Sequence, residues 1–335
     1  MLGPSSLGVA TLSDGFTLTA NAAFAEPDLP SGNVFVASQS GSAIGALASR
    51  GKEMGVGFRG LVSTGGELDL TLGEICLSTV DDPAIESYAL FMENITGAGH
   101  LRSFARAAAE RGKPVMAYKL GRSAEGAGLA VSHTGALAGD DAVADALLAD
   151  LGIARVTTFE ALLEGQHFAR AVELGASTKR PRVCVVSTTG GGGAMAVDCL
   201  AVRGADLSGP SAETIARLAE SGIAAGHGAL IDLTLAGTRY DVMKSALDVV
   251  LSAREFDAVV AVPGSSARFQ PELAVKPIAD SVGDGGPLAS FVVPSAPDAL
   301  RMLRASGVSA FSHARVVCRC RGIGVRASRS PRRRQ

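Results

Sequence analysis

The fold is decided by one stretch, Asn33-Val34-Phe35-Val36-Ala37-Ser38-Gln39-Ser40-Gly41-Ser42, and by the apolar, small-residue segment Ala43 to Met54 that follows it. Asn33 to Ala37 predicts a short buried strand, and the segment after the turn predicts a helix. A strand that runs through hydroxyls and glycine into a helix collects unpaired backbone N–H groups at the positive end of the helix dipole. Such turns bind anions, although serine and glycine also serve as ordinary helix caps. The candidate phosphate-binding residues are Ser38, Gln39, Ser40, Gly41 and Ser42.

The same strand and helix alternation continues along the first half of the chain. Further strands are predicted at Gly60 to Thr64, Ser87 to Met92 and Pro114 to Lys119, and helices at His100 to Arg111 and Asp140 to Leu151. Alternation at this spacing is typical of a doubly wound parallel sheet with helices on both faces.

The pattern restarts after a Ser, Thr, Lys, Arg and Pro-rich boundary at residues 175–181. Arg182 to Val186 predicts a strand, Ser187 to Gly193 a glycine loop, and Ala194 to Arg203 a helix. The loop has neither the spaced glycines of a dinucleotide fingerprint nor the lysine of a P-loop, so it predicts only a second anion site. Its candidate phosphate-binding residues are Thr189, Gly190, Gly191 and Gly192.

One histidine stands out between these two regions. His133 lies in Ser132-His133-Thr134-Gly135-Ala136-Leu137-Ala138-Gly139, where small neighbours leave its ring open to approach. Neutral imidazole can attack phosphorus near pH 7 because its unperturbed pKa is about 6.5. A histidine in a small-residue turn can equally have no function, so the loop alone does not establish a nucleophile.

Glu93 is the candidate acidic partner because it directly follows the predicted strand Ser87 to Met92. Ligand groups in open parallel sheets gather at the carboxyl ends of the strands. The alternative is a solvated carboxylate with no role.

Composition narrows the class of protein. At 335 residues and 47% hydrophobic content, the chain predicts two domains with packed cores. No apolar run approaches the ~20 residues of a membrane span, and no signal peptide is evident, so cytoplasm and no membrane partner are expected. The five scattered cysteines have no metal-ligand spacing, which predicts no metal site.

The net charge of −2 hides an asymmetry. Residues 315–335 hold eight arginines and no acid, which leaves 23 Lys+Arg against 33 Asp+Glu in residues 1–314. The tail has no interleaved aromatic side chains, so we expect a disordered segment and no nucleic-acid partner.

Three stretches together resemble one family. Ser38-Gln39-Ser40-Gly41, the His133 stretch from Ser132 to Gly139, and Ser187-Thr188-Thr189-Gly190-Gly191 are similar to segments of the nucleoside-diphosphate-forming acyl-CoA synthetases, relatives of succinyl-CoA synthetase. The similarity extends over residues 1–312.

The resemblance implies two flavodoxin-like domains and a relay through an acyl phosphate and a phosphohistidine. His133 would carry the phosphate, Glu93 would orient its ring, and the helices that begin at Ser38 to Ser42 and at Gly190 to Gly193 would face the phosphohistidine. A helix end stabilises such an anion by ~0.3 to 2 kcal/mol. The implied reaction interconverts a small carboxylic acid, CoA and ATP with acyl-CoA, ADP and phosphate, with Mg serving the nucleotide.

The resemblance also implies a domain layout. Residues 1–31 would be a remnant of a CoA-binding domain and its linker, 32–176 the phosphohistidine domain, 181–312 a second ligase domain, and 313–335 the arginine-rich tail. In the segment 1–31, Ser5 and Ser6 would lie on the side of the protein that faces CoA. A serine in this segment stands where the family usually has asparagine.

Two features depart from the family. Most of the CoA-binding domain and all of the ATP-grasp domain have no counterpart in the sequence, so partners that supply them, within an oligomer, are expected. Asp232 follows His227-Gly228-Ala229-Leu230-Ile231 instead of an Asn-Pro run. A noncatalytic regulatory or scaffolding remnant and a generic phosphate-binding module are the alternatives to the ligase core.

Overall fold

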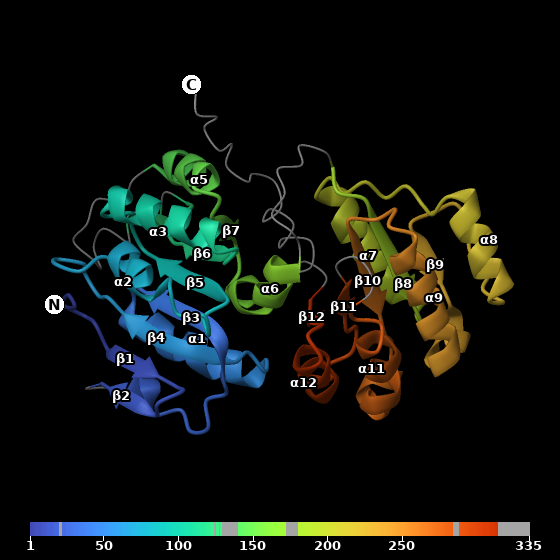
Figure 1. Cartoon of the computed structure of the whole chain (residues 1–335), viewed down its shortest axis with the longest axis horizontal. Coiled ribbons are helices and arrows are strands. Elements are labelled where there is room, and N and C mark those ends of the chain that lie inside the picture. The colour runs from blue at the N-terminus through green and yellow to red at the C-terminus, as the bar shows by residue number, and fades with distance from the viewer. Residues whose placement is uncertain are drawn as a thin grey trace. The chain divides into compact units, whose positions relative to one another are not determined.

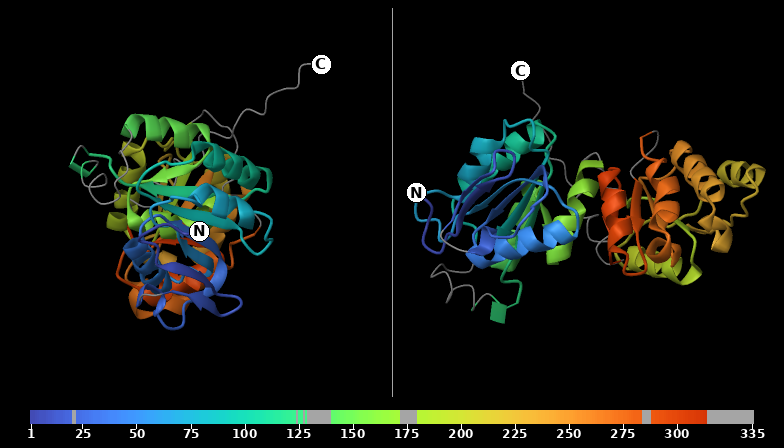
Figure 2. Two further views of the ribbon diagram at one scale, coloured as in Figure 1. Left: turned by 90° about the vertical axis from the view of Figure 1, so that its left-hand side faces the viewer. Right: turned by 90° about the horizontal axis from the view of Figure 1, so that it is seen from below.

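The computed structural model describes residues 1–19, 22–123, 125, 126, 128, 140–171, 180–283 and 288–313. Contacts divide this part of the chain into two compact units, and the division falls between Gln166 and His167. Each unit is a sheet with helices on both faces (Figure 1, Figure 2). The α/β fold expected from the sequence is therefore confirmed, with sheets in which parallel pairing dominates.

The first unit contains a seven-stranded sheet in the order β2-β1-β4-β3-β5-β6-β7. Strands β3 to β7 are parallel, whereas β1 pairs antiparallel with both β2 and β4. The strands are β1 Gly8–Thr11, β2 Phe16–Leu18, β3 Ser31–Ser38, β4 Phe58–Ser63, β5 Ser87–Met92, β6 Val115–Lys119 and β7 Ala154–Val156. The helices are η1 Ala22–Phe24, α1 Gly41–Glu53, α2 Leu72–Thr79, α3 Ala98–Glu110, α5 Asp141–Asp150 and α6 Phe159–Ala171. From His167 onward, α6 belongs to the second unit.

Different helices pack on the two faces of this sheet. Leucine, phenylalanine and alanine side chains of α2, α3 and α5 pack on one face. On the other face, the α6 residue Phe159 contacts the rings of Phe91 and Tyr118 from neighbouring strands, and α1 packs against Phe58. Burial on both faces explains why the central strands read as continuous apolar runs.

The second unit repeats the arrangement with five parallel strands in the order β12-β11-β10-β8-β9. Its strands are β8 Val183–Ser187, β9 Leu230–Asp232, β10 Ala258–Val262, β11 Leu288–Phe291 and β12 Ser309–Phe311. Its helices are α7 Gly190–Val202, α8 Ala212–Glu220, η2 Thr234–Thr238, α9 Tyr240–Ser252, α10 Ser266–Phe269, α11 Pro271–Ala279 and α12 Pro297–Ala305.

The structure corrects the sequence-based prediction in two places. Helix α7 begins at Gly190, not at Ala194, so the glycine run forms the first helical turn. Side chains there would meet Val293 and Leu230 at Gly192 and Gly193, which explains glycine despite its poor helix propensity. The first sheet is also not purely parallel, because residues 8–18 form a hairpin on its edge; the ancestry proposed for residues 1–31 stays a prediction.

Within the described parts of the chain, no helix combines the length and apolar composition needed to cross a bilayer.

Glycines 51 and 99 provide a matched test of the packing of the first unit. A Cβ on Gly51 would lie 2.2 Å from the buried Phe58 ring, whereas a Cβ on Gly99 meets nothing within 4 Å. We expect Gly51→Ala to destabilise the protein by about 1–3 kcal/mol through overpacking, and Gly99→Ala to be neutral or stabilising by up to about 1 kcal/mol. Urea unfolding of both variants measures this, and equal free energies of unfolding would contradict the packing of α1 on β4.

His167 makes stability depend on pH. Burial, with Arg170 and Arg304 nearby, lowers the pKa of His167 to about 4, below the unfolded value of about 6.5. The unfolded chain therefore binds more protons between these values, and up to about 3 kcal/mol of stability is lost as the pH falls through that window. His167→Gln should lose less stability than the wild type between pH 7 and pH 5 in urea unfolding; identical losses would exclude this histidine as the cause.

Candidate functional site

The candidate site of the first unit lies where its strand order reverses. The chain passes from β3 through α1 to β4 on one side, and then returns through α2 to β5 on the other side of β3. The loops after β3 and β5 therefore diverge and leave a crevice at the carboxyl ends of these two strands, where ligands of such sheets bind. Ser38 to Ser42 follow β3 and Glu93 follows β5, so the structure brings these predicted residues together.

The turn into α1 has the features of an anion site. Ser40 is the N-cap residue of α1, but its hydroxyl does not cap the first turn. By contrast, Thr71 caps α2 with a complete capping box, and Ser211 caps α8. The Ser38 hydroxyl donates to the Ser40 carbonyl oxygen at 2.7 Å and so fixes the turn. Among the described residues, the hydroxyl of the N-cap Ser40 therefore does not compete with an anion for the first N–H groups of α1.

The N-terminal segment lies on the same turn. A Cβ on Gly41 would be 2.5 Å from the carbonyl oxygen of Ser5, so only glycine fits there. The Ser6 hydroxyl donates to the Ser63 carbonyl at the end of β4. Ser5 itself has a positive φ of 65°, a strained conformation for serine. Ser5 thus lies against the start of α1 and Ser6 against the end of β4, and their place on the CoA side stays a prediction.

Glu93 is held at the strand end by its backbone. Its carboxylate belongs to a residue that is only 6% exposed, and its N–H donates to the Gln39 side-chain oxygen at 2.6 Å. Buried carboxylates need partners, and a histidine ring supplies a suitable donor. His133 itself lies outside the described residues, so its pairing with Glu93 stays a prediction.

Lys119 is a charged residue of this edge that the sequence reading overlooked. It ends β6, directly opposite Met92 in the parallel register, and is 4% exposed. Burial lowers the pKa of Lys119, and the nearby Arg155 lowers it further, whereas Asp141 and Glu93 oppose this effect. The signal that could have found it is the one that found Glu93, namely a charged residue at the end of a buried strand.

The second predicted anion site belongs to the second unit. Thr189 is the N-cap residue of α7 without a side-chain cap bond, and Ser187 fixes the turn by donating to the Thr189 carbonyl at 2.7 Å. Unlike the turn before α1, the turn before α7 has a carboxylate beside it. A Cβ on Gly190 would lie 3.1 Å from Oδ2 of Asp232, whose Oδ1 accepts from the Thr234 N–H. Asp232 thus places negative charge beside the tip of α7.

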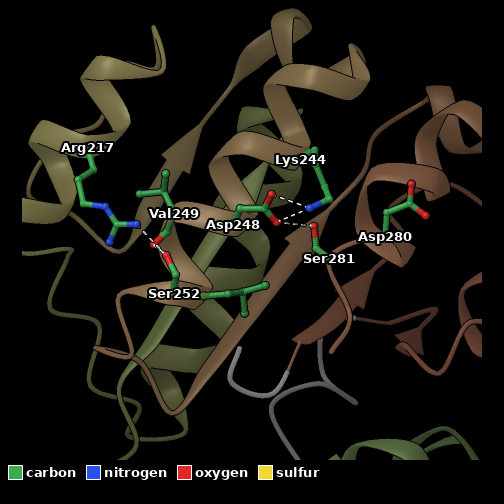
Figure 3. Close-up of a pocket in the computed structure, with 8 residues that line it drawn as sticks. Arg217, Lys244, Asp248, Val249, Ser252, Asp280 and Ser281 are labelled. Atoms are coloured by element: carbon green, nitrogen blue, oxygen red, sulfur yellow. Dashed lines mark hydrogen bonds and ion pairs between the residues drawn. The ribbon is translucent and has the colours of Figure 1, made fainter. Parts of the chain in front are cut away.

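A separate cavity of about 270 Å³ lies among helices of the second unit (Figure 3). It is lined by helices α8 and α9 and the end of α11, and not by strand ends. Some of its charges already have partners: Lys244 pairs with Asp248, and Asp280 pairs with Lys276. The cavity also contains Arg217, which donates to the hydroxyl of Ser252 and has no acidic partner among the described residues. Among the described residues, no group of three or more His, Cys, Asp or Glu side chains is placed to hold a metal ion.

Comparisons with known proteins agree with this geometry. The succinyl-CoA ligase like flavodoxin domain matches residues 31–169. An ADP-forming acetate–CoA ligase of Methanocaldococcus jannaschii is 29% identical over 218 residues, which are 65% of this chain and 30% of that protein. The ADP-forming 4-hydroxybutyrate–CoA ligase of Nitrosopumilus maritimus is 32% identical over 199 residues, 59% of this chain and 28% of that protein. This chain therefore spans less than a third of the length of these relatives.

A solved structure extends the likeness to both units. The dinucleotide forming acetyl-coenzyme A synthetase 1 of Ca. Korarchaeum cryptofilum, in complex with phosphate and ADP, aligns with a TM-score of 0.79 at 25% identity. The alignment covers 96% of this chain and 69% of that chain. Some relatives divide the enzyme between chains: the alpha subunit of an ADP-forming acetate–CoA ligase of Pyrococcus furiosus is 30% identical over 207 residues, 62% of this chain and 43% of that subunit.

The carboxylate beside α7 generates a prediction. Asp232→Asn removes the negative charge at the helix tip while an oxygen remains for the Thr234 N–H, so inorganic phosphate should bind about two- to fivefold more tightly. Titration with phosphate, followed by ³¹P NMR or calorimetry, measures the affinity.

Asp241→Asn is the matched control, because Asp241 is an exposed acid at the start of α9 and pairs with Arg239. It makes the same change in net charge within an exposed ion pair and should leave the affinity unchanged. Weaker phosphate binding by Asp232→Asn would show that Asp232 does not oppose anions at α7.

Proposed function

This chain belongs to the NDP-forming acyl-CoA synthetases, and we propose that it is the phosphohistidine-carrying core of an acid–thiol ligase. The observation that carries the proposal is the switch point of the first unit, where an uncapped helix tip and the buried Glu93 follow adjacent strands. A phosphorylated side chain needs both an anion site and a group that orients the nucleophile.

In the proposed relay, a neutral ring nitrogen of His133 attacks the phosphorus of an acyl phosphate. The N–P bond forms while the bond between phosphorus and the acyl oxygen breaks, and the electron pair leaves with the carboxylate. Glu93 accepts a hydrogen bond from the proton on the other ring nitrogen, which fixes the ring. An oxygen of the terminal phosphate of ADP then attacks phosphorus, forms ATP and returns the imidazole.

The residues of this chain act through position and charge. The N–H groups at the start of α1 would hold the phosphoryl oxygens, and those of α7 would do so from the second unit. Such positioning supplies most of the catalysis in phosphoryl transfer, because little covalent chemistry is left for the protein. The acyl phosphate would arise when phosphate attacks the thioester of acyl-CoA and expels the CoA thiol.

The remaining components are proposed to come from elsewhere. ATP or ADP with Mg would bind an ATP-grasp domain or subunit, and CoA a domain of which Ser5 and Ser6 border the site. The substrate class is a small carboxylic acid. The division of the Pyrococcus furiosus enzymes into subunits supports an assembly of this kind.

Labelling tests the proposal directly. With an ATP-grasp partner and γ-labelled ATP, the full chain should acquire phosphate that is labile in acid and stable in base. His133→Ala should abolish the label, and Glu93→Gln should slow labelling about 10- to 100-fold because the ring is no longer held in place.

His100→Ala is the matched control, since His100 is half exposed on α3 and should label like the wild type. Equal label on His133→Ala, or none on the wild type, would refute the ligase core. The second of these results would favour the noncatalytic remnant.

A further inference from the structure

We propose that Gln39 is the positioning residue that holds Glu93 in place, and that it does not itself bind the phosphoryl group. This inference rests on the proposed function, because it assigns a task to Glu93. It changes the role expected for Gln39 from its sequence position alone, which was that of a phosphate ligand.

Both polar atoms of the Gln39 side chain bond the loop after β5, and the acceptor capacity of its oxygen is fully used. Its oxygen accepts from the N–H of Glu93 at 2.6 Å and from the N–H of Asn94 at 2.9 Å. Its nitrogen donates to the Asn94 side-chain oxygen at 3.2 Å. The residue is 5% exposed, so these bonds form away from water, where losing one costs most. Both lone pairs of the oxygen are used, and the amide points at the loop after β5.

The backbone of Gln39 reinforces this link. Its N–H donates to the carbonyl of Phe91 at 3.0 Å, which continues the pairing of β3 with β5 by one residue. Gln39 also lies two residues before Gly41, the first residue of α1. One residue therefore fixes the anion-binding turn and the Glu93 backbone relative to each other.

Glutamine suits this position for a specific reason. The loop presents two N–H groups that need an acceptor and one side-chain oxygen that needs a donor, and a single primary amide supplies both. Asparagine is shorter by one methylene, and leucine or methionine would leave buried N–H groups unpaired. The residue type is thus explained by the loop, with no phosphate required.

The second unit contains the same bonds without the carboxylate. Thr188 donates its N–H to the Val262 carbonyl at 3.1 Å, and its hydroxyl accepts from the N–H of Gly264 at 2.9 Å. Gly264 therefore occupies the place that Glu93 has in the first unit. The threonine reaches one backbone N–H, whereas Gln39 reaches two and an additional side chain. The larger number of hydrogen bonds thus occurs in the first unit, where Glu93, the carboxylate with a proposed function, follows the strand.

The loop after β5 is also bonded to a second part of the first unit, so the bonds of Gln39 can be removed without detaching the whole loop. The Thr96 hydroxyl donates to the carboxylate of Glu67, which also accepts from the Leu72 N–H at 2.8 Å. Loss of the Gln39 bonds should therefore loosen the loop at Glu93 without unfolding the unit.

The test uses the full chain with Gln39→Met, which has nearly the same shape but no amide. Amide hydrogen exchange at Glu93 and Asn94 should accelerate at least about tenfold. The rate at which phosphoramidate, a small phosphoryl donor, phosphorylates His133 should fall about tenfold. In the Gln39→Met, Glu93→Gln double variant, the rate should be no lower than in Glu93→Gln alone, since both changes act through one carboxylate.

Two further variants separate positioning from a structural role. Gln39→Glu keeps the acceptor oxygen, and Asn94 can turn its amide to donate, so slow exchange at Glu93 and Asn94 should return. Its added negative charge opposes an anion at α1, so for this variant hydrogen exchange alone is the readout. Gln166→Met removes an equally buried glutamine, which donates to the Leu162 carbonyl in α6, and should change neither readout.

The outcomes distinguish the two proposals. Unchanged exchange at Glu93 and Asn94 in Gln39→Met overturns the positioning role. Faster exchange with an unchanged phosphorylation rate also overturns it, and leaves the proposed function standing if Glu93→Gln is slow. If Glu93→Gln and the wild type phosphorylate equally fast, Glu93 has no role in the reaction and the positioning role of Gln39 fails with it, whereas the ligase core is refuted only by the labelling of His133.

Discussion

The parallel pairing of β3 with β5 is the constraint on which the candidate site depends. Because β4 lies on the far side of β3, the chain leaves these two strands in opposite directions, and their carboxyl ends remain uncovered by a crossover. Gln39 extends the pairing beyond the sheet by bonding Phe91, Glu93 and Asn94. The tip of α1 and the backbone of Glu93, whose proposed roles are to hold an anion and to orient a base, are thereby fixed relative to each other.

The two units share the hydrogen bonds at the turn after their first parallel strand, and they differ in the charged residues beside that turn. In each, a serine hydroxyl closes the turn after the first parallel strand, and the next residue bonds the strand beside it. The first unit then presents Glu93, whereas the second presents Gly264 and places Asp232 near its helix tip. A carboxylate that orients a nucleophile is needed only once, while a helix tip that holds an anion can serve in both units. The repeated hydrogen bonds therefore follow from the shared sheet topology, and the charged residues that are not repeated are those to which we assign different roles in the two units.

Buried charge gathers at the same edge of the first sheet. Lys119 ends β6, and Arg155 is the middle residue of the short strand β7 and is paired with Asp141 at the start of α5. Desolvation makes isolated buried charges unfavourable, so opposite charges from adjacent elements compensate one another. Asp141 and Glu93 both oppose the lowered pKa of Lys119. The edge thus carries several charges while the core beneath it stays apolar.

The sequence by itself determined the alternation of strands and helices, the division into two α/β halves, and Ser38 to Ser42 and Glu93 as strand-end residues, because buried strands and glycine turns leave local patterns. It did not determine the β1–β2 hairpin, whose strands are short and partly exposed. It also gave no sign that Gln39 contacts Glu93, 54 residues away, or that Asp232 lies beside Gly190. Those contacts depend on strand order, and strand order follows from which long-range pairings bury the most surface, which no local pattern encodes.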